Sequence, residues 1–530
     1  MKLIFIAASD TLLHHEAKDK SRSKMPLFTK SMFQDYIYHQ GLGLDFYGLV
    51  DYFSPGPESG KAGRLHRYKL PVQAGLHLAG YLDSLGLEYE IINHLDTEWE
   101  RFKELYAGCA EPPLVGLSAT YHLSWGSLRH VVETLRTVDP NMRIISGGAF
   151  YRAMILNGDH PAQWEPYMRQ LQLEAVFYAM NSEGDLGQYL SSENCRGLEQ
   201  IPNLAWFGPS GEFRLNEETR HEPIETVPPS SWGKLPFINQ TLPLRSSTGC
   251  VFKCSYCLYP LMAHQYREIS LDSIKKIIDD RLRHQPLKYL FFIDDAVNLS
   301  SKRLAGICEM LRPTGLQWAA HIRAGEMTAD EAEMMRAAGC LMVALGVESG
   351  DRDILSLMRK KADPEKIVRG IGYLKRAGIR TYGTFIVGFP GETEDSAETT
   401  RQFIQASELD FFQLFPYWHC SLPQMTELGE KFNLQGSRYN WSHQGMTAKR
   451  AIELAVRWRA QINSPLHIVG GYYFIFTMLD AGFTFEETTR LQTLFNRMTA
   501  AQSCSEPQSI EPLAAQFAQV TQTARTRLLG

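Results

Sequence analysis

Three cysteines lie within eight residues of one another: Cys250, Cys254 and Cys257, in a C-x3-C-x2-C run. Three thiolates on one tight loop can hold three irons of a cubane iron–sulfur cluster. The fourth iron then has no protein ligand, and an open iron is a place where a small molecule can be bound and reduced. The spacing therefore favours redox chemistry on a small ligand.

Two alternatives use the same residues. A zinc site would usually need a fourth Cys or His at a short, fixed spacing, and His264, seven residues after Cys257, is the nearby candidate. The three thiols could also be buried structural cysteines that happen to cluster. Their number and spacing favour the cluster over both.

The run from 245 to 260, with Tyr256 directly before the last cysteine, resembles the cluster loop of the radical S-adenosylmethionine (SAM) superfamily. The resemblance implies that Cys250, Cys254 and Cys257 hold a [4Fe-4S] cluster whose open iron chelates the amino and carboxylate groups of SAM. It also implies that an electron from the cluster cleaves SAM to methionine and a 5′-deoxyadenosyl radical.

The bulk composition is that of an ordinary soluble protein of two to four domains, with 530 residues, 44% apolar and 21% charged. A net charge of −5 gives no electrostatic reason to expect nucleic acid or an anionic membrane as partner. The other cysteines are scattered singly, which indicates reduced thiols in a cytoplasmic protein: Cys109, Cys195, Cys308, Cys340, Cys420 and Cys504.

The chain offers no sequence signal for export or membrane insertion. Residues 1–9 contain too short an apolar run for a signal peptide and are better explained as a buried first strand. The longest apolar candidate, 467–483, is interrupted by Gly470, Gly471 and Asp480. We expect a cytoplasmic protein without a membrane partner.

Residues 1–195 alternate strand and helix signals and predict a parallel, doubly wound, Rossmann-like sheet, whose ligand would bind beyond the carboxyl ends of the strands. After the first strand comes a polar, irregular stretch of roughly sixty residues, long enough to suggest a function or an insertion. The remaining elements are a helix at 71–85, a strand at 89–93, a strand at 114–120, a helix at 127–138, and strands at 142–146 and 175–178.

The strand containing Ser118 and Thr120, the following Trp125, and the turn at Gly147 and Gly148 resemble cobalamin-binding domains that precede radical SAM domains. Glycines that close a strand let a bulky ligand approach the backbone. The D-x-H-x-x-G motif that supplies a histidine ligand to cobalamin is absent, as is common in the radical SAM subgroup. The alternative is a degenerate domain that only packs against the catalytic one.

A connector rich in Pro, Gly, Ser and Glu spans 196–240 and leads to a catalytic domain at 241–425. Six β/α units predict an open, partial version of the (β/α)8 barrel, in which the carboxyl ends of the strands carry the chemistry. The expected strands are 242–246, 289–294, 317–323, 341–347, 383–387 and 411–415, and the clearest helices are 271–284, 329–338 and 364–377.

Polar groups follow these strands in the order that the family uses. The resemblance implies that Asp294 and Asp295 receive the SAM amino group, that Arg323 and Glu348 hold its ribose or carboxylate, and that the turn from Gly388 to Glu392 lies against its adenine. Carboxylates at strand ends also cap helices, and Gly-Phe-Pro-Gly also forms simple tight turns.

The region 426–530 is predicted to be mostly helical, with amphipathic spacing at 446–462 and 485–498 and a loose extension from about Ser505. The run 439–446, with two aromatics and a histidine, resembles a segment of cobalamin-dependent radical SAM methylases, including phosphinate P-methylases. Core packing at the start of a helix is the alternative explanation.

Together the resemblances imply a cobalamin-dependent radical SAM methyltransferase acting on an unactivated carbon, or on phosphorus, of a small molecule such as a natural-product intermediate. One SAM would methylate cob(I)alamin, and a second would yield the radical that abstracts a substrate hydrogen. The substrate radical would take the methyl group from methylcobalamin. Tyr417, Trp418, His419 and Cys420, after the last barrel strand, are the expected substrate contacts, and a flavodoxin or ferredoxin the expected electron donor.

Other functions stay open. Both cofactors could serve a cyclisation or rearrangement without methyl transfer. The first domain could have lost cobalamin, as in a methylthiolase, although no second cluster-type cysteine group is present. The cluster could also belong to a sensor of oxygen or iron, in which case ordered SAM-site acids would have no purpose. SAM cleavage separates the sensor from the enzymes.

Overall fold

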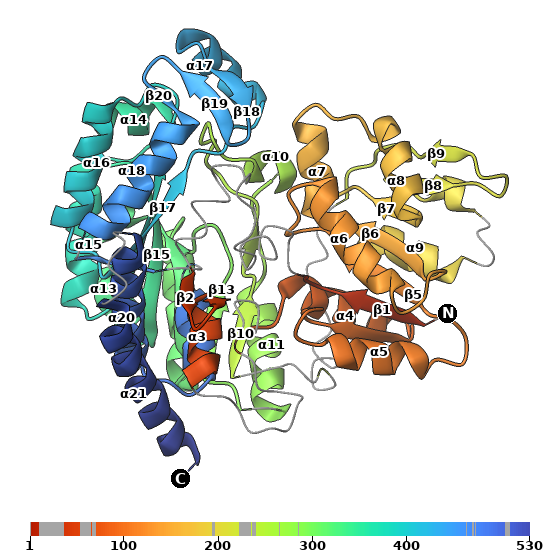
Figure 1. Ribbon diagram of the computed structural model, residues 1–530, viewed down its shortest axis with the longest axis horizontal. Coiled ribbons are helices and arrows are strands. Elements are labelled where there is room, and N and C mark those ends of the chain that lie inside the picture. The colour runs from red at the N-terminus through yellow and green to blue at the C-terminus, as the bar shows by residue number, and fades with distance from the viewer. Residues whose placement is uncertain are drawn as a thin grey trace.

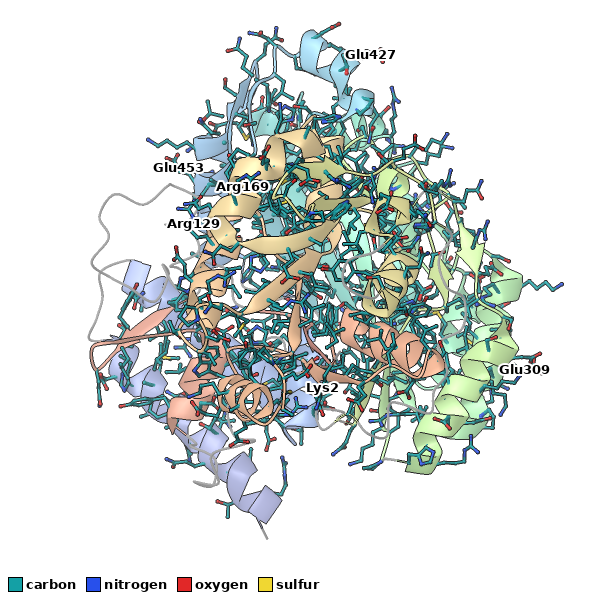
Figure 2. The ribbon with its side chains drawn as sticks, turned by 90° about the vertical axis from the view of Figure 1, so that its right-hand side faces the viewer. Lys2, Arg129, Arg169, Glu309, Glu427 and Glu453 are labelled. Carbon is teal, nitrogen blue, oxygen red and sulfur yellow. The ribbon has the colours of Figure 1, made fainter. Side chains whose placement is uncertain are left out.

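The computed structural model describes residues 2–9, 36–53, 65, 70–192, 197–221, 235, 240–263, 265–284, 286–462, 464–468, 471, 473–503 and 509–529. Two seven-stranded sheets organise the chain, each with its own helices (Figure 1). The first sheet belongs to the N-terminal domain, at the right of the view, and the second forms the central barrel. Seen from the side of the N-terminal domain, the helices that carry Arg129 and Arg169 lie in front (Figure 2).

The first sheet has the strand order β4-β1-β5-β6-β7-β8-β9, and its first five strands are parallel. In chain order those five read 2-1-3-4-5, the flavodoxin-like arrangement, whose ligand site lies where the order reverses, between β1 and β5. The two antiparallel edge strands extend the sheet into the range predicted as a connector. The bounds are β1 Leu3–Ile6, β4 Tyr89–Ile92, β5 Leu114–Ser118, β6 Arg143–Gly147, β7 Leu173–Phe177, β8 Leu204–Phe207 and β9 Phe213–Leu215.

Helices cover both faces of this sheet, because its strands present apolar side chains on both sides. One face packs against α5 Trp99–Ala107, α6 Trp125–Arg136, α7 Ala149–Leu156 and α8 Glu165–Leu171. The other packs against α4 Gln73–Ser84 and α9 Glu183–Ser191. The predicted doubly wound domain is confirmed.

The second sheet has the order β10-β13-β14-β15-β16-β17-β21, and every neighbouring pair is parallel. Six of its strands match the six predicted ones. The seventh, β21, comes from the C-terminal region and was not predicted, because two residues carry no periodic signal. The bounds are β10 Thr241–Leu244, β13 Tyr289–Phe292, β14 Gln317–Ile322, β15 Cys340–Glu348, β16 Arg380–Val387, β17 Phe411–Pro416 and β21 Leu466–His467.

Helices surround the outer face of the barrel and form one continuous apolar core with its strands. They are α10 Tyr259–Ala263, α11 Leu271–His284, α12 Ser301–Leu311, α13 Ala329–Ala337, α14 Arg352–Leu357, α15 Pro364–Arg376, α16 Glu394–Ala406 and α18 Ala448–Gln461. Because each helix returns the chain to the same end of the sheet, all strand ends that carry predicted site residues meet at one edge. The predicted partial barrel is confirmed.

Some side chains of the barrel strands belong to a second apolar core, which is completed by segments far apart in the sequence. Its contributors are β2 Ile37–His39, β3 Leu42–Leu44, α3 Phe46–Phe53, α19 Tyr473–Asp480, α20 Phe485–Ser503 and α21 Ile510–Leu529. Part of the irregular N-terminal stretch thus completes the C-terminal region: Gln502 accepts a 2.8 Å hydrogen bond from the backbone N–H of Tyr38 and donates a 3.0 Å bond to the carbonyl of Tyr36.

One prediction for the C-terminus is wrong. Residues after about Ser505 were expected to form a loose extension, but α21 is a twenty-residue helix. Its Leu513, Phe517 and Val520 are buried against α20 and α3.

The short sheet of β18 Gln435–Ser437, β19 Asn440–His443 and β20 Met446–Thr447 follows α17 Thr426–Lys431. Within the described ranges, no helix combines the length and apolar character needed to cross a bilayer.

The two sheets are joined by direct packing. Leu76 and Ala79 of α4 share one apolar core with Leu242 of β10 and Ile274 of α11. At the other end of the interface, α7 contacts α10. The two domains therefore hold the carboxyl ends of their strands close together (Figure 1).

Candidate active site

The cysteine loop begins immediately after β10, at the carboxyl edge of the barrel. A short hairpin supports its base, in which β11 Ser247–Thr248 pairs antiparallel with β12 Arg267–Glu268. Gly249 has φ +76°, and a Cβ there would collide with the backbone of Gln265. A glycine is therefore required where the chain turns into the cysteines.

The three cysteines lie together on this loop in a partly desolvated setting. Cys254 is buried, and Cys250 and Cys257 are half-buried. Burial, with smaller contributions from neighbouring acidic groups, raises the pKa of the Cys257 thiol to about 12 and also raises that of Cys250. His264, needed by the zinc alternative, lies outside the described residues. Elsewhere in the described chain, as in this loop, no three His, Cys, Asp or Glu side chains converge tightly enough to form a metal site.

The donor set nevertheless fits a cluster better than a single ion. Thiols whose pKa is raised by burial ionise when a cation is placed among them, and iron supplies that charge. Three ligands from one loop leave one position open, which a closed structural zinc site does not do. The metal ligation by Cys250, Cys254 and Cys257 remains a prediction from the sequence.

A hydrogen-bonded triad joins the cysteine loop to the end of β15. Tyr256 donates a 3.0 Å hydrogen bond to Glu348, and Lys360 lies 3.1 Å from the same carboxylate oxygen. The Lys360 ammonium is also 3.3 Å from the Tyr256 hydroxyl. Glu348 is 8% exposed and has φ +71°, a conformation that a non-glycine residue adopts only when its surroundings enforce it.

Lys360 was not among the predicted site residues. Its signal in the sequence is weak, because it stands in the basic run 359–361 that any solvated loop could contain. In the structure its ammonium forms an ion pair with Glu348. A buried carboxylate and an ammonium held side by side can bind the matching charges of a zwitterion such as the amino-acid part of SAM.

The two acids at the end of β13 have different environments. Asp294 is buried and accepts hydrogen bonds from the backbone N–H of Ser246 and from the hydroxyls of Ser246 and Ser247. Its carboxylate therefore closes the end of β10 and is committed to the fold. Asp295 is exposed just after β13, and desolvation by the surrounding protein, then the charge of Asp294, raises its pKa to about 7. Of the two, Asp295 is available to a ligand.

Arg323, at the end of β14, ties two loops together. Its guanidinium lies 3.7 Å from the ring centroid of Phe252, inside the cysteine loop. It donates hydrogen bonds of 2.6 Å and 3.1 Å to the carbonyls of Lys360 and Lys361. The predicted SAM contact by Arg323 remains a prediction, and the geometry gives it a positioning role.

The turn after β16 is fixed by its own carboxylate and by the C-terminal region. Gly388 has φ +92° and donates its N–H to Glu392, which is 1% exposed and whose pKa burial raises to about 8. A Cβ on Gly388 would lie 2.5 Å from the Trp441 ring and 2.6 Å from Ala451. The Glu392 side chain is thus turned inward and closes the turn. The predicted contact with adenine would therefore be made by the backbone of this turn.

The predicted substrate contacts after β17 lie near the N-terminal domain but are mostly enclosed. Tyr417 is 3% exposed and stacks edge-on against Phe389, and its carbonyl accepts a 2.8 Å hydrogen bond from Trp441. Burial raises the pKa of Cys420, and polar contacts from Trp418 and from Asn157 at the end of α7 partly offset this effect. His419 pairs with the backbone of Arg438. Their contact with substrate remains a prediction.

The predicted cobalamin contacts meet at one edge of the first sheet. Ser118 ends β5 and its hydroxyl lies 3.2 Å from that of Thr120, which is exposed. Gly148 follows β6 with φ +121°, and a Cβ there would lie 2.7 Å from the Thr120 hydroxyl. Gly147 pairs with Ser118 in register. The turn therefore presents bare backbone beside an exposed hydroxyl, which suits a large ligand lying on the sheet edge.

A buried histidine near this edge was not predicted from the sequence. His122 is 3% exposed, and its ring nitrogens lie 3.2 Å from the Ser9 hydroxyl and 3.1 Å from the Ser127 hydroxyl. Burial lowers its pKa to about 4, so the ring is neutral at pH 7. Its neighbours Tyr121 and Leu123 are 40% and 45% exposed, and they form an apolar rim on the same loop.

Comparison with known proteins identifies the class. The sequence model of the Radical SAM superfamily matches residues 244–404. An uncharacterized methyltransferase of Pyrococcus horikoshii is 23% identical over 320 residues, which cover 57% of this chain and 66% of that protein. An anaerobic magnesium-protoporphyrin IX monomethyl ester cyclase of Rubrivivax gelatinosus is 24% identical over 388 residues, covering 69% of this chain and 68% of that protein.

A solved structure shares the architecture. The radical SAM methyltransferase TsrM from Kitasatospora setae, solved with cobalamin and a [4Fe-4S] cluster, superimposes with a TM-score of 0.58 at 16% identity over 82% of this chain and 97% of that one. At that identity the likeness shows the fold. The match assigns residues 244–404 to a radical SAM domain, and a domain of this kind implies an enzyme that uses a [4Fe-4S] cluster and SAM.

Proposed function

We propose that this enzyme binds cobalamin in its N-terminal domain and transfers a methyl group to an unactivated carbon, or to phosphorus, of a small molecule. The observation that carries the proposal is the contact between α7 and α10. The first of these helices directly follows the Gly147-Gly148 turn, and the second directly follows Cys257. This contact supports a common space between the two expected cofactor sites.

The residues at the first sheet's edge support a corrin bound without a protein ligand to cobalt. His122 has both ring nitrogens engaged by serine hydroxyls, so it does not offer a lone pair to a metal above the edge. The backbone of Gly148 and the apolar rim of Tyr121 and Leu123 suit a flat, largely apolar macrocycle. Cobalamin, when bound there, would supply a transferable methyl group.

The residues around the cysteine loop support SAM binding in a fixed pose. Glu348 and Lys360 present opposite charges side by side, Tyr256 restrains the carboxylate, and Asp295 supplies a second acid at the barrel mouth. These groups are held by strands and by buried hydrogen bonds. Such preorganisation keeps a reactive fragment close to one target atom.

The relatives also supply a second candidate. The similarity to an anaerobic magnesium-protoporphyrin IX monomethyl ester cyclase favours a ring-forming reaction that uses both cofactors without methyl transfer. The mass of the product separates the two functions, because only methyl transfer adds a CH2 to the substrate. The match of residues 244–404 to the Radical SAM superfamily favours an enzyme over a sensor.

The proposal is tested first by cofactor content. The protein is produced with iron and hydroxocobalamin supplied, and its ultraviolet–visible spectrum is recorded without oxygen after gel filtration. We expect a broad iron–sulfur band together with corrin bands. Iron without retained corrin would overturn cobalamin binding and leave the first domain as a scaffold. If both are retained, SAM with a labelled methyl group then tests whether the label reaches a product.

A further inference from the structure

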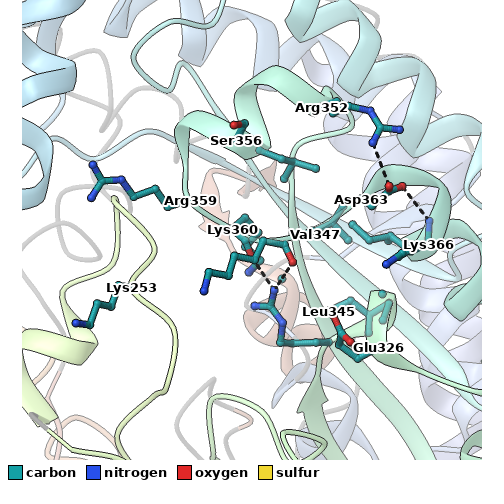
Figure 3. A pocket seen from close by; sticks show the side chains of 18 of the residues that line it. Lys253, Glu326, Leu345, Val347, Arg352, Ser356, Arg359, Lys360, Asp363 and Lys366 are labelled. Atoms are coloured by element: carbon teal, nitrogen blue, oxygen red, sulfur yellow. Dashed lines mark hydrogen bonds and ion pairs between the residues drawn. The ribbon is translucent and has the colours of Figure 1, made fainter.

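A basic cavity adjoins the cysteine loop, whose Val251 and Lys253 are among its lining residues. It has a volume of about 880 Å³ and lies at the carboxyl ends of β14 and β15 (Figure 3). Its lining contains two acids, Glu326 and Asp363, against seven cations: Lys253, Arg323, Arg352, Arg359, Lys360, Lys361 and Lys366. The chain as a whole has a net charge of −5, so this concentration of positive charge is local.

Several of these cations already have partners in the fold. Lys360 pairs with Glu348, Arg359 with Glu427, and Arg352 with two acids at the start of α15. Three others, namely Lys253, Lys361 and Lys366, form no ion pair with any residue in the described part of the chain. Their charge is therefore available to a partner from solution.

The cavity rim includes the cysteine loop itself. Val251 is 54% exposed and Lys253 lines the cavity, and both lie between Cys250 and Cys254. The residue between them, Phe252, packs under the guanidinium of Arg323. An electron that arrives at this rim therefore enters through the segment that carries two of the expected cluster ligands.

We propose that this cavity and its rim form the docking surface for an acidic one-electron donor protein. The inference rests on the proposed function, because SAM cleavage requires a reduced cluster. The donor would place acidic side chains against Lys361 and Lys366 and its redox centre against Val251. One electron leaves the donor's flavin or iron–sulfur centre and reduces the cluster, and no bond or proton changes at the docking surface.

The chemistry of the surface fits such a donor better than a tightly bound partner. Redox partners commonly meet over small interfaces of less than about 1,200 Å², so that they can separate after transfer. Opposite charges raise the rate of encounter by ten- to a thousandfold at low salt and have less effect at high salt.

The test combines the substitutions K361E and K366E in one cluster-loaded variant. Both side chains are exposed, and neither is among the residues assigned to SAM or the cluster. The matched control is K276E with K302E, which reverses two exposed charges on α11 and α12 outside the cavity. Reduction of the cluster is followed by stopped-flow absorbance, once with a reduced, strongly acidic flavodoxin and once with dithionite. The dissociation constant of oxidised flavodoxin is measured separately at low and high salt.

We expect the cavity variant to be reduced by flavodoxin at least about tenfold more slowly at low salt, with weaker flavodoxin binding, and to be reduced normally by dithionite. The control should match the native chain in every assay. Unchanged flavodoxin kinetics and binding in the cavity variant would overturn the proposal. An equal loss with dithionite would also overturn it and would assign the cavity to SAM or substrate.

Failure of the proposed function would look different. If the native protein holds the cluster but does not cleave SAM with dithionite, the enzymatic proposal fails. Flavodoxin binding and cluster reduction would still report on the docking surface in that case, because neither measurement requires SAM.

Discussion

Tyr256 in the cysteine loop donates a 3.0 Å hydrogen bond to Glu348, which lies 92 residues later at the end of β15. The bond connects the loop expected to hold the cluster with the carboxylate expected to hold SAM. Glu348 is buried in a left-handed conformation, so its position depends on such partners. We infer that Tyr256 positions Glu348 and does not itself touch the reacting atoms.

Replacing Tyr256 by Phe should weaken SAM binding while leaving the cluster in place. The change removes one donor to a buried carboxylate, which costs about 2 kcal/mol, or roughly a thirtyfold rise in the dissociation constant. Equilibrium dialysis with the cluster-loaded protein measures the SAM affinity, and iron analysis measures the cluster.

The matched control is Tyr266→Phe, which removes a 3.0 Å tyrosine–glutamate bond to Glu268 on the exposed hairpin. That variant should bind SAM like the native chain. Equal SAM affinity in the Tyr256 variant and the native protein would show that Glu348 does not depend on this bond.

Replacing Cys254 by Ala should abolish SAM cleavage. Only two thiolates would remain on the loop, so the cluster would lack its third protein ligand. Both the iron content and the yield of 5′-deoxyadenosine should therefore fall to background after anaerobic reconstitution. Cys109→Ala, on the half-buried thiol after α5, provides a control that should retain both. Formation of 5′-deoxyadenosine by the Cys254 variant would disprove the cluster assignment.

The strands and helices of the barrel could be predicted from the sequence because each of them is long and periodic. Helix α11, for example, begins and ends at the predicted residues, Leu271 and His284. Elements without a local signal were missed. The two residues of β21 form a strand only because β17 offers an unpaired edge. Helix α21 is stabilised by packing against α20 and α3, segments that the sequence does not bring together.

The same limit applies to the site. The grouping of the strand-end residues at one site could be predicted, because the carboxyl ends of parallel strands lie at one edge of the sheet. What each side chain does there depends on neighbours from other segments. Asp294 is occupied by Ser246 and Ser247, and Lys360 reaches Glu348 only through the turn after α14. Such partnerships are tertiary, so sequence spacing cannot assign them.

Replacing Gly148 by Ala should cost more than the same change at Gly158. Both glycines have positive φ, +121° and +91°, so each substitution strains the backbone by about 1 to 2 kcal/mol. At Gly148 the new methyl group would also lie 2.7 Å from the Thr120 hydroxyl, whereas nothing lies within 4 Å at Gly158. We therefore expect Gly148→Ala to lose corrin on gel filtration and Gly158→Ala to retain it. Equal retention by both variants would remove the Gly147-Gly148 turn from the cobalamin site.

His122 should make the stability of the N-terminal domain depend on pH. Burial lowers the pKa of its ring to about 4, whereas an unfolded histidine titrates near 6.5. Between these values the unfolded chain binds a proton that the folded chain excludes, so the free energy of unfolding falls as the pH falls. Between pH 7 and pH 5 the expected loss from this group is about 2 kcal/mol.

The variant His122→Gln removes this titration but keeps a side chain able to bond Ser9 and Ser127. Its melting temperature, followed by circular dichroism, should therefore fall less between pH 7 and pH 5 than that of the native chain. Some dependence should remain, because desolvation also lowers the pKa of the half-buried His321 to about 4. His284→Gln, on a ring with 55% side-chain exposure, should show the native slope. A native slope in the His122 variant would mean that the ring is not held neutral at the sheet edge.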